Sequence, residues 1–94
     1  MSDTPDPVID QFVDALWLEE GLSRNTLAAY RRDLVLYDRW LRSRGQALLG
    51  SSRTDLDAYF AARHAATKAS SANRRLAVLR RFFRWALRER LVPT

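Results

Sequence analysis

The 94-residue sequence contains no cysteine, which excludes disulfide bonds, thiolate chemistry and cysteine-ligated metal sites. This composition fits a reducing compartment, and we expect a cytoplasmic protein. No apolar run is long enough to span a bilayer or to form the core of a signal peptide, so we expect no membrane contact. With 47% hydrophobic and 29% charged residues, the chain has the composition and length of one globular domain with a single core.

The residues that assemble into enzyme sites are also scarce. The only histidine, His64, lies in an alanine-rich stretch, where a surface or partly packed side chain is the simplest expectation. Asp55 and Asp57 stand at a predicted helix start, which favours capping over metal binding. Glycine-rich phosphate-binding motifs and zinc-ligand spacings are missing. We therefore expect no catalytic residue, no cofactor and no metal in this chain.

Charge is distributed unevenly along the chain. Residues 1–20 hold six acidic and no basic residues, whereas the remainder holds all 16 basic residues against five acidic ones, a balance of +11. All basic residues except Lys68 are arginine, whose planar fork suits phosphate, although a GC-rich genome produces the same bias. The separation of charge predicts one side that attracts polyanions.

Apolar residues recur at helical spacing, and they predict four helices at residues 7–20, 24–44, 54–66 and 71–91. The predicted N-terminal caps are Asp6 followed by Pro7, Ser23, Thr54 with Asp57 reaching back, and Ser70 or Ser71. Gly21 and Gly45 follow the ends of the first two helices. We expect a compact all-α fold. Periodicity leaves open whether the helices form an up-down bundle or two crossed pairs.

The fourth predicted helix carries a row of arginines opposite its apolar side. Its expected core stripe is Ala72, Leu76, Leu79, Phe83, Ala86 and Leu87, with a second apolar flank of Val78, Phe82 and Trp85. Its basic arc is Arg74, Arg80, Arg81, Arg84 and Arg88. The second predicted helix also places its arginines on one side, with Asp33 on the opposite flank. A solvated basic face is the plain interpretation, and a surface for a polyanion is the functional one.

The order of these motifs resembles the N-terminal core-binding domain of tyrosine recombinases, the phage-integrase superfamily, and in particular its Xer subfamily. The resemblance covers nearly the whole chain. It rests on FVDALWLEEGLS, on Thr26, Tyr30 and Asp33-Leu34, on Trp40-Leu41, and on Ser71 and Arg74 followed by Arg80-Arg81-Phe82-Phe83.

The resemblance implies a four-helix SAM-like fold, with two roughly perpendicular helix pairs, that forms half of a C-shaped clamp on duplex DNA. Residues 1–94 would be this single domain, with 1–6 a flexible lead and 92–94 the start of a linker to a catalytic domain that the chain lacks. The partners implied are double-stranded DNA and, at full length, recombinase subunits in a tetramer; the isolated domain is expected to be a monomer. The DNA-binding positions implied are Arg24, Asn25, Thr26, Arg31, Ser70, Ser71, Asn73, Arg74, Arg80 and Arg81.

Two other functions remain open from the residues alone. Val78, Phe82 and Trp85 could form an exposed patch for a partner helix, which would make the chain a protein–protein interaction module. A helix-turn-helix repressor is the weaker alternative, because the short paired helices and tight glycine turn of that motif are missing.

Overall fold

The computed structural model describes residues 4–63 and 69–92, and the elements in these stretches are all helical. In chain order they are α1 (Val8–Glu20), α2 (Arg24–Ser43), the 3-10 turn η1 (Leu48–Gly50), α3 (Arg53–Arg63) and α4 (Ala69–Arg88). The all-α prediction is confirmed. The predicted helix ends that fall on described residues differ by at most three positions from those observed. His64 and the last part of the third predicted helix lie outside the described residues.

The first two helices begin and end within one residue of the predicted bounds. The Asp6 carboxylate accepts the Val8 N–H at 3.0 Å, and the Ser23 hydroxyl accepts the Thr26 N–H at 3.2 Å. Gly21 and Gly45 adopt left-handed conformations with φ of 61° and 74°, which glycine tolerates without a steric cost. Local sequence therefore fixes both ends of α1 and α2.

The cap of α3 was predicted wrongly. The hydroxyl of Ser52, not of Thr54, accepts the Asp55 N–H at 3.3 Å, and the Asp55 carboxylate accepts the Ser52 N–H at 2.8 Å. Both Ser52 and Thr54 have an aspartate three residues later, so the sequence offers two capping boxes. The 3-10 turn ends at Gly50, and α3 begins at the first of these two capping boxes, the one formed by Ser52 and Asp55.

The C-terminal end of α4 also differs from the prediction. The helix ends at Arg88 rather than near Leu91, because Arg90 adopts a left-handed φ of 59°. The Leu91 N–H then returns to the Ala86 carbonyl at 2.8 Å, a helix-ending hydrogen bond that usually follows glycine. An arginine at this position gives no sequence signal for the stop.

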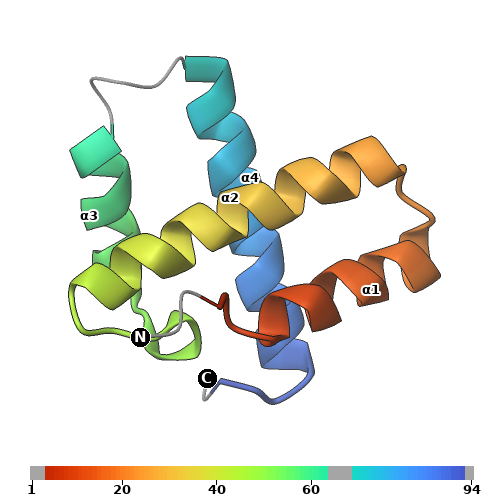
Figure 1. Ribbon diagram of the computed structural model, residues 1–94, viewed down its shortest axis with the longest axis horizontal. Helices are drawn as coiled ribbons and strands as arrows, with labels where there is room; N and C mark the ends of the chain where they lie inside the picture. Colours follow the sequence, from red (N-terminus) through yellow and green to blue (C-terminus); the bar gives the residue numbers. More distant parts are fainter. Residues whose placement is uncertain (1–3, 64–68, 93–94) are drawn as a thin grey trace.

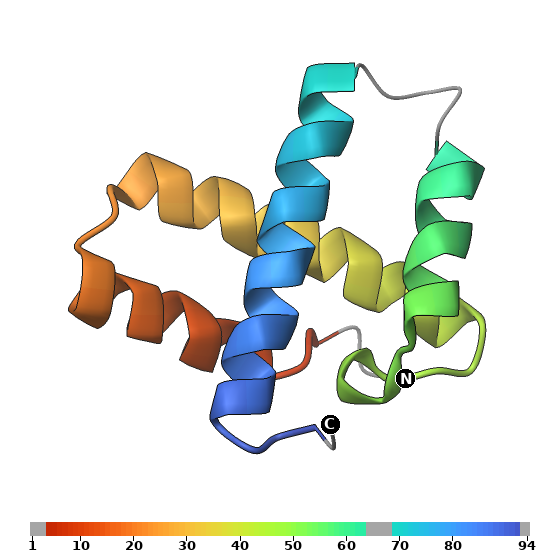
Figure 2. The same ribbon diagram turned by 180° about the vertical axis from the view of Figure 1, so that it is seen from behind.

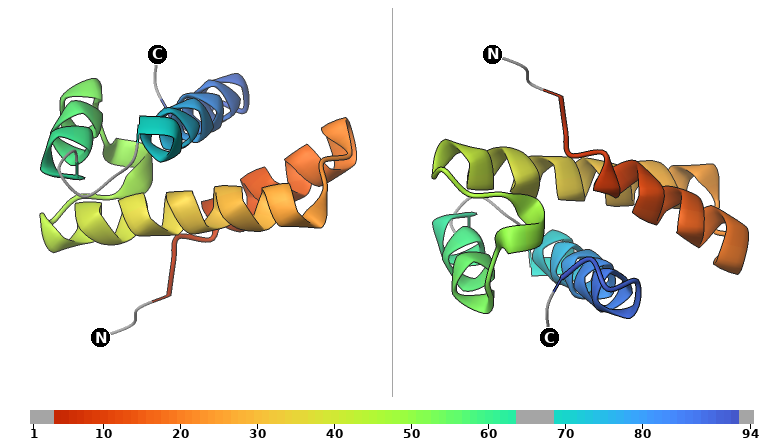
Figure 3. Two further views of the ribbon diagram at one scale, coloured as in Figure 1. Left: turned by 90° about the horizontal axis from the view of Figure 1, so that it is seen from above. Right: turned by 90° about the horizontal axis from the view of Figure 1, so that it is seen from below.

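The helices form two crossed layers. Figures 1 and 2 show α4 crossing α2, and Figure 3 shows α1 beside α2 in one layer with α3 and α4 in the other. The N-terminal half of α4 extends past α2 on the side opposite α1 (Figures 1 and 2). Among the two packings left open by periodicity, the structure therefore has the crossed pairs.

Aromatic side chains fill the core where these layers meet. Phe12 of α1 packs edge-on against Phe82 of α4, with ring centroids 5.4 Å apart, and lies equally close to Trp85. A second cluster joins α2 to α3, where the Tyr37 and Tyr59 rings are 5.0 Å apart. Burial of these rings supplies the main stabilisation of the fold.

The buried side of α4 is centred on the residues predicted to be its flank. Val78, Phe82 and Trp85 are buried, with Phe82 fully enclosed, whereas Leu87 is 45% exposed. Helical periodicity is compatible with an apolar arc centred on either the predicted stripe or the predicted flank. The crossing with α2 and the contact with α1 place Phe82 of the flank at the centre of the buried arc. The patch proposed for a partner helix is therefore part of the core.

None of the helices in the described ranges has the length and apolar character needed to cross a membrane.

Candidate nucleic-acid interface

One edge of α4 carries three arginines seven residues apart, and each pairs with a carboxylate of the other layer. Arg81 pairs with Glu20, and Arg88 donates to Glu19 at 3.1 Å. The hydrogen bond to Glu20 raises the pKa of Arg81. The third member, Arg74, binds Asp33 of α2.

The pair between Arg74 and Asp33 joins the N-terminal halves of α2 and α4. Nε and Nη2 of Arg74 donate to the two carboxylate oxygens of Asp33 at 3.1 and 3.2 Å. The Asp33 side chain is fully buried, and the Arg75 Nε lies 3.5 Å from its Oδ1. Two guanidinium groups thus neutralise one enclosed carboxylate where the layers cross.

The adjacent outer face of α4 carries exposed polar side chains, two of them arginines. Asn73, Arg80 and Arg84 are exposed and recur at helical spacing along this face. Neither Arg80 nor Arg84 makes an ion pair with any residue in the described ranges. Their guanidinium groups are therefore available to an external anion.

The N-terminal half of α2 provides the other predicted contacts. Arg24 and Asn25 are exposed in its first turn, whereas Thr26 is half-buried and its N–H and hydroxyl both bond to Ser23. Arg31 donates to Asp10 of α1 at 2.8 Å. Residues two apart point about 200° apart on a helix, so Arg31 faces α1 while Asp33 faces α4.

Ser70 and Ser71 belong to the first turn of α4, but their side chains lie outside the part of the chain that the structure describes. Their predicted contacts with DNA stay predictions.

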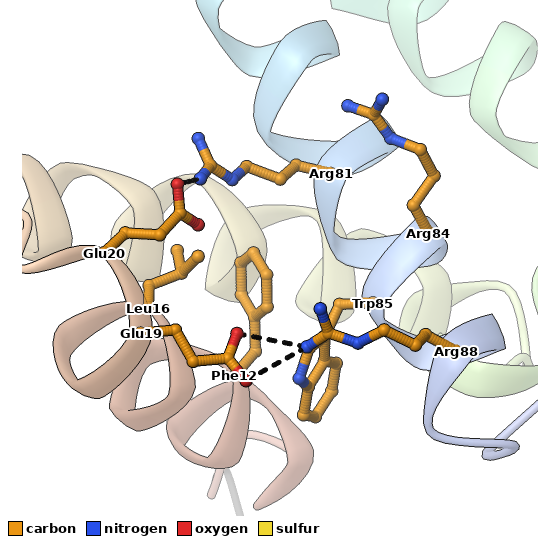
Figure 4. Close-up of a pocket in the computed structure, with 8 residues that line it drawn as sticks. All are labelled: Phe12, Leu16, Glu19, Glu20, Arg81, Arg84, Trp85 and Arg88. Atoms are coloured by element: carbon orange, nitrogen blue, oxygen red, sulfur yellow. Dashed lines mark hydrogen bonds and ion pairs between the residues drawn. The ribbon is translucent and has the colours of Figure 1, made fainter.

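A cleft of about 330 Å³ separates the C-terminal half of α1 from α4 (Figure 4). Its apolar wall consists of Phe12, Leu16 and Trp85, and two ion pairs cross its rim. Figure 4 shows Arg84 directed away from the carboxylates of α1, while Arg81 and Arg88 point toward them. The cleft is therefore bounded by acids on one side and by arginines on the other.

The carboxylates of α1 interrupt the row of guanidinium groups expected on one outer surface. Asp10, Glu19 and Glu20 engage Arg31, Arg88 and Arg81 respectively. These three arginines lie on the predicted basic sides of α2 and α4, but each is paired with a carboxylate of α1. The helical wheel missed the pairing because it ignores side chains that other helices contribute.

Sequence reasoning also missed the roles of Asp33 and Arg75. Helical periodicity places Asp33 on a flank of the second helix and Arg75 outside the basic arc of the fourth. One signal was available, because Asp33 stands directly before a core leucine on a side otherwise free of acids. A buried carboxylate at such a position needs cationic partners.

In the described part of the chain, the structure contains no cluster of three or more histidine, cysteine or acidic side chains placed to hold a metal ion.

The chain is similar to curated tyrosine recombinases. It is 63% identical over 84 residues to tyrosine recombinase XerD of Ralstonia nicotianae, covering 89% of this chain and 27% of that protein. It is 47% identical over 87 residues to XerD of Proteus mirabilis, covering 92% and 28%, and 45% identical over 93 residues to XerD of Pseudomonas aeruginosa, covering 98% and 31%. The chain thus spans less than a third of the length of these relatives.

A search of solved structures gives no significant match. The family model described as phage integrase, N-terminal SAM-like domain, matches residues 9–90, from the buried face of α1 to the turn after α4. Because this match covers most of the chain, the chain belongs to the family of phage integrase N-terminal SAM-like domains.

Proposed function

We propose that this chain is the duplex-DNA-binding module of a site-specific tyrosine recombinase of the Xer type, which resolves chromosome dimers. The observation that carries the proposal is the family match across residues 9–90 together with the 63% identity to a tyrosine recombinase. Recombination requires that the protein bind a duplex. A basic helical domain can bind DNA without supplying catalytic residues.

The unpaired arginines support this proposal physically. Arg24, Arg32, Arg39, Arg80 and Arg84 are exposed and have no ion-pair partner within the described ranges. Guanidinium groups that neutralise phosphates release condensed counterions, which drives binding to DNA of any sequence. On a domain of this size, the unpaired guanidinium groups repel one another. A bound polyanion reduces that repulsion.

The proposed interface, called the α2–α4 corner, consists of residues 24–33 of α2 and 73–81 of α4. The contact between Arg74 and Asp33 supports it, because it joins the two segments where α4 crosses α2. Asn25, Asn73 and Arg74 are the candidates for base edges, since amide and guanidinium groups bond adenine and guanine bidentately. Arg24, Thr26, Arg31, Arg80 and Arg81, with Ser70 and Ser71, are the candidates for phosphates.

In the full-length protein we propose that this module forms half of a clamp and that recombinase subunits assemble as a tetramer on DNA. Catalysis would belong to a part of that protein beyond this chain. By itself we expect the module to be monomeric and to bind duplex weakly, at about micromolar dissociation constants.

Titration of a labelled duplex at several salt concentrations tests the proposal. About four phosphate contacts give a slope of log affinity against log salt near −3.6, or roughly a 150-fold loss between 50 and 200 mM. Arg74→Ala should weaken binding without unfolding the domain. Binding that does not respond to salt would refute contact with phosphates.

A protein–protein interaction module is the second candidate, now based on a different surface. Trp17 and Leu18 of α1 are 49% and 81% exposed, and a large apolar pair on a small domain is a common feature of interfaces. Gel filtration without DNA distinguishes the two functions, since a stable dimer that ignores added duplex would favour this candidate.

A further inference from the structure

The ion pair between Asp33 and Arg74 differs from the pairs that α1 makes with other arginines. The Asp33 carboxylate is fully buried, whereas Asp10, Glu19 and Glu20 are each more than 40% exposed. An exposed carboxylate that loses its arginine is hydrated by water. Asp33 cannot be hydrated in this way, so separating Arg74 from Asp33 costs more free energy than separating Arg31 from Asp10.

The contact with Asp33 occupies one edge of the Arg74 guanidinium and leaves the other edge available. Nε and one N–H of Nη2 donate to the carboxylate. A guanidinium has five N–H donors, so three remain, two on Nη1 and one on Nη2. The Arg74 side chain is 41% exposed, which leaves this outer edge open to a ligand.

The outer edge has the geometry of a recognition fork. Two parallel N–H donors match the oxygens of a phosphate or the O6 and N7 acceptors of guanine. A fork that is fixed before binding loses little conformational freedom when it binds. The neighbouring Arg75, which is only 17% exposed, contacts the same carboxylate and helps to neutralise it.

We propose that Asp33 is the positioning residue for DNA recognition: it fixes the Arg74 guanidinium so that its outer edge, Nη1 and Nη2, meets a pair of acceptors on duplex DNA. This inference rests on the proposed function and adds a role for a residue that itself never touches the ligand. Arg74 keeps its contact with Asp33 in the complex, because the outer edge of its guanidinium is free for the ligand.

A double-mutant cycle on duplex binding tests the proposal. Arg74→Ala and Asp33→Asn should each weaken binding about three- to tenfold, and the double variant should bind no more weakly than Arg74→Ala alone. Arg74→Lys keeps the charge but loses the fork, and it should bind nearly as weakly as Arg74→Ala. Non-additivity of this kind means that Asp33 acts through Arg74.

Asp38→Asn is the matched control. Asp38 lies five residues further along α2, its side chain is 3% exposed, and it pairs with Arg42 at 3.3 Å. The Asp38 carboxylate accepts the Asp6 N–H, so it contacts the N-terminal segment rather than α4. The Asp38→Asn variant should bind duplex within about twofold of the unmodified chain. Circular dichroism melts set a temperature at which every variant is folded.

The acceptor on DNA is identified by the same titrations. A phosphate partner makes Arg74→Ala weaken binding to all duplexes alike and reduces the salt slope by about 0.9. A guanine partner confines the loss to some sequences and leaves the slope unchanged. Either result supports the proposal.

Three results would overturn it. Asp33→Asn could bind as well as the unmodified chain while Arg74→Ala binds weakly, or Asp33→Asn and Asp38→Asn could weaken binding equally. The double variant could also lose the product of the two single losses. Failure of the unmodified chain to bind any duplex would instead reject the proposed function, and this inference with it.

Discussion

Neutralising Glu20 would show whether α1 competes with DNA for the arginines of α4. The pair between Glu20 and Arg81 is the most enclosed of the three that α1 makes, with side chains 42% and 32% exposed. Ion pairs at such exposure contribute about 0.2–1 kcal/mol. Because Glu20 competes with a DNA phosphate for the Arg81 guanidinium, Glu20→Gln should raise duplex affinity by up to about fivefold. A phosphate gained by Arg81 should steepen the salt slope by about 0.9.

The matched control for this variant is Asp14→Asn. Asp14 is exposed on the same helix and makes no ion pair with any residue of the described ranges, so the substitution changes the net charge equally. Fluorescence anisotropy with a labelled duplex at three salt concentrations gives both affinity and slope. The reasoning fails if Glu20→Gln raises affinity no more than Asp14→Asn, because the gain would then reflect net charge alone.

Three further predictions concern stability. Phe82→Ala removes a fully buried ring that packs on Phe12 and should cost about 3–5 kcal/mol in urea unfolding; a loss below about 1 kcal/mol would contradict the core described above. Ser52→Ala should cost about 1 kcal/mol in the same assay and Thr54→Ala much less, and the reverse order would restore the cap first predicted. Burial raises the pKa of Tyr59 above its ordinary value of 10.0, and its hydroxyl has no hydrogen-bond partner among the described residues. Because the pKa of Tyr59 is raised in the folded state, its contribution to stability is fully present below pH 10 and is lost as the pH rises through the folded-state pKa. The Tyr59→Phe variant should therefore be as stable as the unmodified chain at pH 7 and should lose less stability in alkali. Equal alkaline losses in both proteins would contradict this assignment.

Local signals in the sequence predicted the helices well. Asp6, Ser23, Gly21 and Gly45 each act within one turn of their own position, so no knowledge of the rest of the chain is needed to interpret them. The end of α4 escaped prediction because Arg90 takes a conformation that glycine usually adopts.

Tertiary partners decided what the sequence left open. The exposed sides of α2 and α4 are visible in periodicity, but the partner of each arginine is not. Arg81 lies among residues of the basic arc, yet it binds a glutamate 61 positions earlier. The bond between Arg74 and Asp33 likewise depends on how α4 crosses α2. The resemblance to a family supplied candidate residues, and it could not say which of them are held in place by carboxylates.

The location of the interface is tested most directly by nuclear magnetic resonance of the isotope-labelled chain titrated with an unlabelled duplex. Our account predicts that amide shifts concentrate in the α2–α4 corner, residues 24–33 and 73–81, while α3 stays unchanged. Shifts centred on α3 or on the exposed face of α1 around Trp17, or no shifts at low salt, would contradict it.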